Sequence, residues 1–90
     1  MYLADTGILL RFLLRNDQSY SAIRKAVRIL KTRGEQLVTT SQNITEFWNV
    51  CTRPTTTRGG LGLSVDATEP RVRLIERHFR VLPDSPAVYE

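Results

Sequence analysis

The chain has 90 residues, 41% of them hydrophobic and 24% charged, a balance that is typical of a folded globular domain and excludes a disordered one. A chain of this length forms at most one domain with a modest core, so we expect residues 1–90 to be a single domain. The 13 Lys and Arg residues outnumber the nine Asp and Glu residues and give a net charge of +4, which suits a polyanionic partner without requiring one.

The sequence also indicates where the protein works. Cys51 is the only cysteine, so it cannot form an intramolecular disulfide, and this favours a reducing compartment. No segment approaches the roughly 18 consecutive apolar residues of a membrane-spanning helix. Asp5 and Arg11 interrupt the apolar N-terminus, and no cleavage-site pattern follows, so we expect no signal peptide. These features predict a soluble, cytoplasmic protein with no membrane partner.

The chain opens with a short apolar run, then Asp-Thr-Gly, then a second apolar stretch. Residues 2–4 predict a strand without polar alternation, as in parallel sheets that are covered on both faces, and residues 8–14 predict a helix. Asp5 then lies at the carboxyl end of the strand, where ligands bind in open α/β sheets. Two interpretations remain open: Asp5 caps the following helix, or its carboxylate belongs to a functional site.

A second helix is predicted from a cap at Ser21 to Thr32, ended by Gly34. Its apolar positions recur with helical spacing at Ile23, Ala26, Val27 and Leu30. Its other side carries the basic residues Arg24, Lys25, Arg28 and Lys31. This basic side either contacts nucleic acid or is simply solvated. Residues 35–40 then predict a second strand, β-branched at its end.

Residues 41–53 predict a third helix, stopped by Pro54. Its apolar stripe consists of Ile44, Phe47, Trp48 and Cys51. Glu46 falls on the side opposite that stripe. One interpretation is structural, because Asn43 and Glu46 have the spacing of a capping box. The other is functional: if the two strands are parallel neighbours, Glu46 and Asp5 face the same edge of the sheet.

The remaining chain predicts a loop, a helix and a strand. The loop at 54–63 is rich in glycine but lacks the Gly-Lys-Ser/Thr ending of a phosphate-binding loop. A fourth helix is expected over 69–79, with Thr68 as its cap. Its His78, the only histidine, lies beside the apolar stripe and is left out of the site. A third strand is expected at 80–83, and Asp84 opens a further helix as its cap.

Two segments together resemble the PIN domain, the nuclease fold of VapC-like toxins of type II toxin–antitoxin systems. They are Tyr-Leu-Ala-Asp-Thr-Gly-Ile-Leu-Leu-Arg at 2–11 and Gln-Asn-Ile-Thr-Glu-Phe-Trp-Asn-Val at 42–50. The family opens with a hydrophobic strand ending in Asp-Thr-Asn, so Asp5 and Thr6 match, while Gly7 occupies the Asn position. The resemblance implies a three-layer α/β/α fold with a short parallel sheet.

The resemblance also implies an activity, that of a metal-dependent endoribonuclease. Its cofactor is Mg²⁺ or Mn²⁺, with Asp5 and Glu46 as metal ligands and Thr6 as a supporting catalytic residue. The metal ionises a bound water for attack on an RNA phosphodiester. The implied partners are the RNA substrate, an antitoxin protein and a second copy in a homodimer.

The chain covers only the N-terminal part of the family's domain. The family's remaining acidic residues come from a later strand–helix segment, and nothing after Asp84 supplies it, so we expect an incomplete PIN-like domain truncated at its C-terminus. This leaves an unpaired apolar edge at residues 2–4 and puts the enzyme activity in doubt. Two alternatives therefore stay open. One is a non-catalytic antitoxin- or partner-binding module of the same fold, and the other is a small basic RNA-binding domain.

Overall fold

The computed structural model describes residues 1–83, which form a mixed α/β structure of four helices and three short strands. In chain order the elements are β1 (Tyr2–Leu3), α1 (Thr6–Leu13), α2 (Tyr20–Thr32), β2 (Leu37–Thr40), α3 (Ser41–Thr52), α4 (Val65–His78) and β3 (Arg80–Leu82). The sequence predicts each of these elements. The further helix expected after Asp84 lies outside the described residues. No helix within residues 1–83 is long and apolar enough to cross a membrane.

The three strands form one parallel sheet in the order β1-β2-β3. Tyr2 lies opposite Leu37 and Leu3 opposite Val38, while Val38 in turn lies opposite Arg80. The expectation that the first two strands are parallel neighbours is therefore confirmed. Parallel strands end at the same edge, so the residues that follow β1 and β2 emerge side by side.

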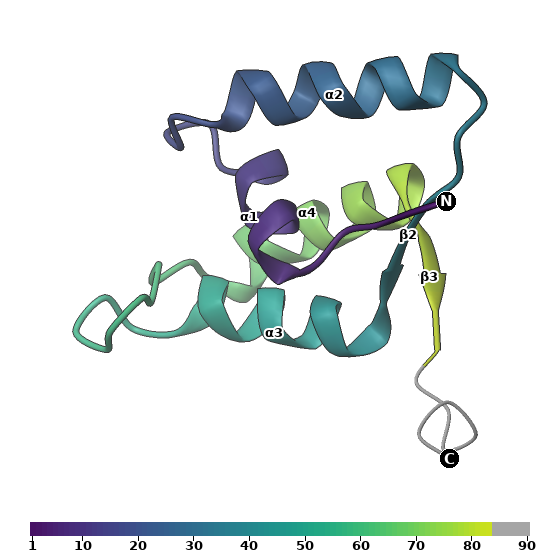
Figure 1. Ribbon diagram of the computed structural model, residues 1–90. Coiled ribbons are helices and arrows are strands. Elements are labelled where there is room, and N and C mark those ends of the chain that lie inside the picture. Colours follow the sequence, from purple (N-terminus) through teal and green to yellow (C-terminus); the bar gives the residue numbers. More distant parts are fainter. Residues whose placement is uncertain (84–90) are drawn as a thin grey trace.

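The helices cover one side of this sheet. The three strands follow one another in the same direction across the sheet. Right-handed connections between such strands place both connecting helix pairs, α1 with α2 and α3 with α4, on the same face. In Figure 1 the ribbons of α1, α3 and α4 lie to the left of β2 and β3, and α2 runs above them. Two of the three expected layers are thus present within residues 1–83.

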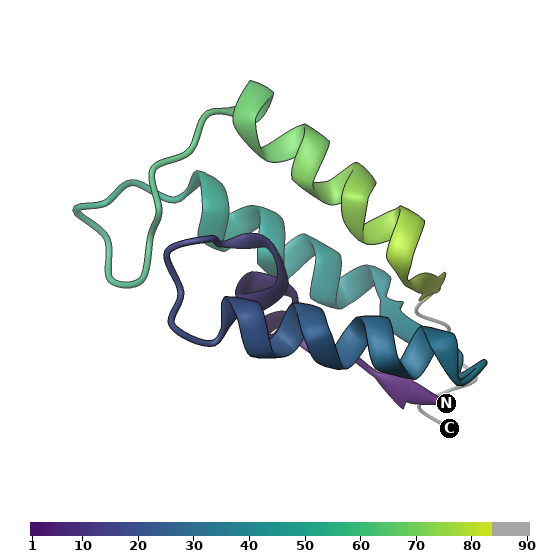
Figure 2. The same cartoon turned by 90° about the horizontal axis from the view of Figure 1, so that it is seen from above.

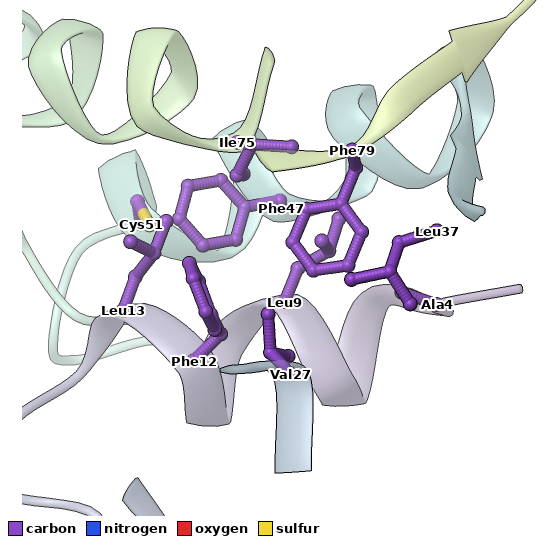
Figure 3. Packing of buried hydrophobic residues seen from close by; sticks show 10 residues of the cluster. All are labelled: Ala4, Leu9, Phe12, Leu13, Val27, Leu37, Phe47, Cys51, Ile75 and Phe79. Carbon is purple, nitrogen blue, oxygen red and sulfur yellow. The ribbon is translucent and has the colours of Figure 1, made fainter. Parts of the chain in front are cut away.

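The hydrophobic core lies between the helices and the helix-facing side of the sheet. Figure 3 shows it from close by, with Phe12 of α1, Phe47 of α3 and Phe79 at the end of α4 at its centre. The rings of Phe12 and Phe79 meet edge to face at 5.4 Å between centroids, a preferred aromatic geometry. Ala4 and Leu37 join the same cluster from the sheet. This packing fixes α1 and α3 side by side behind the ends of β1 and β2.

The end of α2 follows the prediction, whereas its start does not. Gly34 adopts a left-handed backbone (φ +78°) and donates its N–H to the carbonyl of Lys31, while Glu35 N–H reaches the carbonyl of Leu30. This is the Schellman ending that a glycine favours. The helix begins at Tyr20 after Ser19 rather than after Ser21. The reason is local: the carboxylate of Asp17 accepts the Ser19 N–H at 2.7 Å and turns the chain earlier.

The start of α4 is also earlier than predicted. Ser64 is the cap, since its Oγ accepts the Ala67 N–H at 3.1 Å, and the helix runs from Val65 rather than Glu69. Thr68 is therefore inside the helix, fully buried, and donates its hydroxyl to the Ser64 carbonyl. Pro70 lies inside the helix, where it cannot donate a backbone N–H. The expectation that Thr68 caps this helix was wrong because Ser64 offers a cap one turn earlier.

Candidate functional site at the carboxyl edge of the sheet

Asp5 follows β1 and is the N-cap of α1. Its Oδ1 accepts the N–H of Ile8 at 2.9 Å, so the capping interpretation of Asp5 is confirmed. Capping uses one carboxylate oxygen, and Oδ2 makes no hydrogen bond to another of residues 1–83. The side chain is exposed. Capping therefore holds the carboxylate in one orientation and leaves its second oxygen available to a ligand.

Glu46 lies in the second turn of α3, and it takes no part in capping that helix. The cap is Thr40, whose hydroxyl accepts the Asn43 N–H at 3.1 Å. Asn43 is thus inside the helix, and the capping-box interpretation of Asn43 and Glu46 was wrong. Glu46 is exposed while its neighbour Phe47 is completely buried, as the helical periodicity predicts.

Thr6 connects the two carboxylate-bearing elements. Its hydroxyl donates to Oε2 of Glu46 at 2.8 Å and lies 3.2 Å from Oδ1 of Asn43. A hydroxyl has one proton, so the shorter contact to the charged oxygen is the stronger of the two. Because Thr6 directly follows Asp5, this bond brings the Glu46 carboxylate to the same edge as Asp5. Of the three residues expected in the site, Thr6 and Glu46 are therefore in direct contact, and Asp5 is the chain neighbour of Thr6.

Asn43 is a member of this site that the sequence analysis did not identify. Its amide donates to the carbonyl of Ala4 at 3.4 Å, which turns its Oδ1 toward Thr6. The signal in the sequence was its position three residues before Glu46, since residues with that spacing lie on the same side of a helix. A second neighbour, Gln42, donates to Oε1 of Glu46 at 3.5 Å. Both oxygens of Glu46 are thus oriented by neighbouring side chains.

The end of β1 is tied firmly to the end of β2. Ala4 N–H donates to the Val38 carbonyl at 2.8 Å. The fully buried Thr39 hydroxyl donates to the Ala4 carbonyl, also at 2.8 Å. A buried hydroxyl that is satisfied in this way rigidifies its surroundings. The positions from which Asp5 and α3 emerge are therefore fixed relative to one another.

Gly7 leaves open space beside Asp5. A Cβ at this position would lie 3.4 Å from Oδ1 of Asp5 and 3.9 Å from Nη1 of Arg11, which are ordinary contact distances. Its backbone is not in the left-handed region, where only Gly34, Gly59 and Gly62 are found among the described residues. Neither sterics nor backbone conformation therefore demands glycine here.

The donor atoms at this edge are all oxygens: two carboxylates, the Asn43 amide oxygen and the Thr6 hydroxyl. Hard cations such as Mg²⁺ prefer these donors, and Mg²⁺ commonly binds through one or two carboxylates while keeping several waters. In residues 1–83 no group of three or more His, Cys, Asp or Glu side chains converges. The type of donor atom at this edge therefore suits a hard cation, but the described residues form no cluster of three acidic or other metal-binding side chains there.

His78 lies away from this edge, at the end of α4. Its ring contacts Phe12 edge to face at 5.3 Å, and its Nδ1 is 2.7 Å from the ammonium of Lys31. Partial burial and the nearby Lys31, Arg24 and Arg77 lower the pKa of His78. Through these contacts His78 joins α4 to α1 and α2.

The site is therefore defined by contacts within the chain, above all the bond between Thr6 and Glu46. No family model, no curated protein and no solved structure shows a significant match to this chain.

Proposed function

We propose that this protein is a PIN-like, metal-dependent endoribonuclease in which Asp5 and Glu46 hold Mg²⁺ or Mn²⁺. The observation that carries the proposal is the 2.8 Å hydrogen bond from Thr6 to Glu46, which holds the Glu46 carboxylate of α3 beside the residue that directly follows Asp5, at one edge of a parallel sheet. The resemblance of segments 2–11 and 42–50 to the opening and the third helix of VapC-like toxins supports it independently.

Each residue has a defined task in this proposal. A bound cation supplies an ionised water and offsets negative charge on the phosphate. Asp5 presents Oδ2, because its Oδ1 is held by the N–H of Ile8. Glu46 is kept in one rotamer by Thr6 and Gln42, so little side-chain entropy is lost when a ligand binds. Thr6 is a positioning residue, since it acts through the carboxylate of Glu46.

The proposed substrate is RNA, and the charge of the chain supports that choice. A net charge of +4 attracts a polyanion over long range. Arg11, in the last turn of α1, is exposed and can contact a phosphate of the bound strand. Such binding weakens as salt rises, because bound phosphates release counterions.

The decisive experiment is cleavage of a structured RNA with and without Mn²⁺, together with Mn²⁺ binding measured by electron paramagnetic resonance. We expect the unmodified chain to need Mn²⁺, and Asp5→Asn and Glu46→Gln each to lose cleavage and weaken Mn²⁺ binding. Glu76→Gln is the matched control, because Glu76 is an exposed acid on α4 that takes no part in the site. Absence of metal-dependent cleavage by the folded chain would contradict the catalytic proposal.

A partner-binding module of the same fold is the second candidate, and an apolar groove favours it. The groove, about 180 Å³ in volume, lies between β1 and α2 and is lined by Tyr2, Leu3, Ile23, Ala26 and Leu30 among others. Tyr2 and Leu3 are 50% and 63% exposed on a strand whose outer edge is unpaired within residues 1–83. We propose that an antitoxin-like amphipathic helix docks there, and binding of a second copy of the chain is the alternative outcome of the test. Sedimentation of Leu3→Lys beside the unmodified chain tests the dimer, and titration with an amphipathic peptide tests the antitoxin.

A further inference from the structure

Three arginines surround a cavity that is separate from the carboxylate site. The cavity, about 450 Å³ in volume, lies between the start of α2 and the middle of α4 and is lined by Arg15, Arg24 and Arg71 together with Tyr20, Leu13 and Leu74. No acidic side chain lines it. The views in Figures 1 and 2 place the connection between α1 and α2 at the same end of the molecule as the first half of α4.

Arg24 is held in place by contacts with two aromatic rings. Its Nε donates to the carbonyl of Phe12 at 2.7 Å, and its guanidinium carbon lies 4.0 Å from the centre of the Phe12 ring and 5.0 Å from that of Tyr20. The alternative that this side of α2 is merely solvated therefore fails for Arg24, although Lys25 and Arg28 are exposed. With Nε occupied, the Nη groups of Arg24 donate to no other group within residues 1–83. Its remaining donors are thus fixed in direction before any ligand arrives.

Arg71 contributes a buried donor without a partner. Its Nη1 donates to the carbonyl of Ala67 at 2.5 Å, but its Nε is buried and makes no hydrogen bond. A buried donor left unsatisfied is unfavourable, and such groups are rare in folded proteins. The position therefore needs an acceptor that the described part of the chain does not provide.

The positive charge around the cavity is also not neutralised. The ion pairs within residues 1–83 are Arg73 with Glu69 and the N-terminus with Glu35, so none of the three cavity arginines has a carboxylate partner there. Asp17 lines an adjoining cavity together with Arg15 and Arg71, but it forms an ion pair with neither of them, and its carboxylate accepts the N–H of Ser19. Like charges gathered without a counter-charge repel one another, and an anion in the cavity would remove that cost.

We propose that this cavity is a binding site for a phosphate-class oxyanion. Guanidinium groups bind phosphate through paired, charge-assisted hydrogen bonds, and several of them around one cavity match the charge and the acceptor oxygens of a phosphate group. The ligand is either the terminal phosphate of an RNA strand or free phosphate. The proposal stands independently of metal binding at Asp5 and Glu46.

The test follows the arginine Nε–H signals by NMR while inorganic phosphate is added to the full chain, with sodium chloride keeping the ionic strength constant. We expect phosphate to shift the Arg71 and Arg24 signals to saturation and chloride not to do so. Replacing Arg71 by Gln removes a charged donor and should weaken binding about tenfold. Arg73→Gln is the matched control on the same helix, outside the cavity lining, and should bind as the unmodified chain does.

Two further arms complete the design. Arg15→Gln removes a second arginine of the cavity and should also weaken phosphate binding. Because the Arg15 side chain is exposed, this variant still tests the proposal if Arg71→Gln does not fold. If a short RNA with a 5′-phosphate displaces phosphate and the same RNA with a 5′-hydroxyl does not, the ligand is the end of a strand. If neither RNA displaces phosphate, the ligand is free phosphate. Equal shifts by phosphate and chloride, or an equal loss of binding in Arg73→Gln and Arg71→Gln, would overturn the proposal.

Discussion

The hydroxyl of Thr6 donates a 2.8 Å hydrogen bond to Oε2 of Glu46, a residue 40 positions further along the chain. This bond joins the first turn of α1 to the second turn of α3 across the ends of β1 and β2. It exists because the two strands are parallel neighbours and end at one edge. Every element of the proposed site is positioned by that relationship.

Removing the Thr6 hydroxyl should impair activity without unfolding the protein. Thr6→Val keeps the shape of the side chain but frees the Glu46 carboxylate to change rotamer. We expect Mn²⁺-dependent cleavage to fall by about tenfold or more, as for other residues that orient a metal ligand. Thr6→Ser should restore most of the rate, because it restores the donor.

The control for this prediction is Thr45→Val. Thr45 is an exposed residue of α3 whose hydroxyl donates only to the Ser41 carbonyl. Equal activity of Thr6→Val and the unmodified chain would mean that the bond to Glu46 does not position a functional group.

Gly7→Asn should be tolerated by the fold. A Cβ at Gly7 meets Oδ1 of Asp5 and Nη1 of Arg11 at ordinary contact distances, and Asn is a slightly better helix former than Gly. We expect the free energy of unfolding in urea to change by no more than about 0.5 kcal/mol. In the proposed nuclease the added amide should support Asp5 and raise the cleavage rate. A clear loss of stability would show that the space at Gly7 is needed by the fold.

Gly60→Ala should destabilise the loop after α3 much more than Gly34→Ala destabilises the end of α2. A Cβ at Gly60 would lie 2.2 Å from the carbonyl oxygen of Pro54 and 2.7 Å from that of Arg53, and backbone atoms cannot rotate away. We expect a loss of about 2–3 kcal/mol, at the upper end of overpacking costs. Nothing lies within 4 Å of a Cβ at Gly34. Gly34→Ala should therefore lower the free energy of unfolding by only about 1 kcal/mol, the cost of placing alanine in a left-handed backbone.

The stability of the protein should fall as the pH decreases below the 6.5 that is ordinary for histidine. Partial burial, then Lys31 and Arg24 of α2 and Arg77 of α4, lower the pKa of His78 in the folded state. The unfolded chain therefore binds a proton at a higher pH than the folded chain does. The stability that neutral His78 contributes is fully present above pH 6.5 and is lost as the pH falls toward the pKa of His78 in the folded state.

Urea midpoints measured between about pH 7.5 and about pH 5 test this, with His78→Gln as the comparison. The neutral ring accepts from Lys31 at Nδ1, and a protonated ring cannot. The variant should show a flatter profile over this window. A midpoint that rises as the pH falls in the unmodified chain alone would contradict the sign of the shift.

The sequence by itself determined the elements and their order. Spacing such as that of Ile23 and Val27 indicates which side of a helix is buried, because helical periodicity is a local property. Gly34 marked the end of α2 for an equally local reason, its tolerance of a left-handed backbone. The position of Asp5 after the first strand also follows from a local pattern, the apolar run at residues 2–4 that comes directly before it.

Only the tertiary structure decided how the side chains at the site are used. Asn43 and Glu46 have the spacing of a capping box, yet Thr40 takes the cap and Glu46 accepts from Thr6. Arg24 stands in a basic stripe of the sequence, yet it lies over the ring of Phe12. Glu46 and Arg24 each contact a partner that is distant in the chain, and Thr40 and Asn43 are two nearby residues that could each have capped α3. Such choices depend on how the strands and helices pack, which no local pattern encodes.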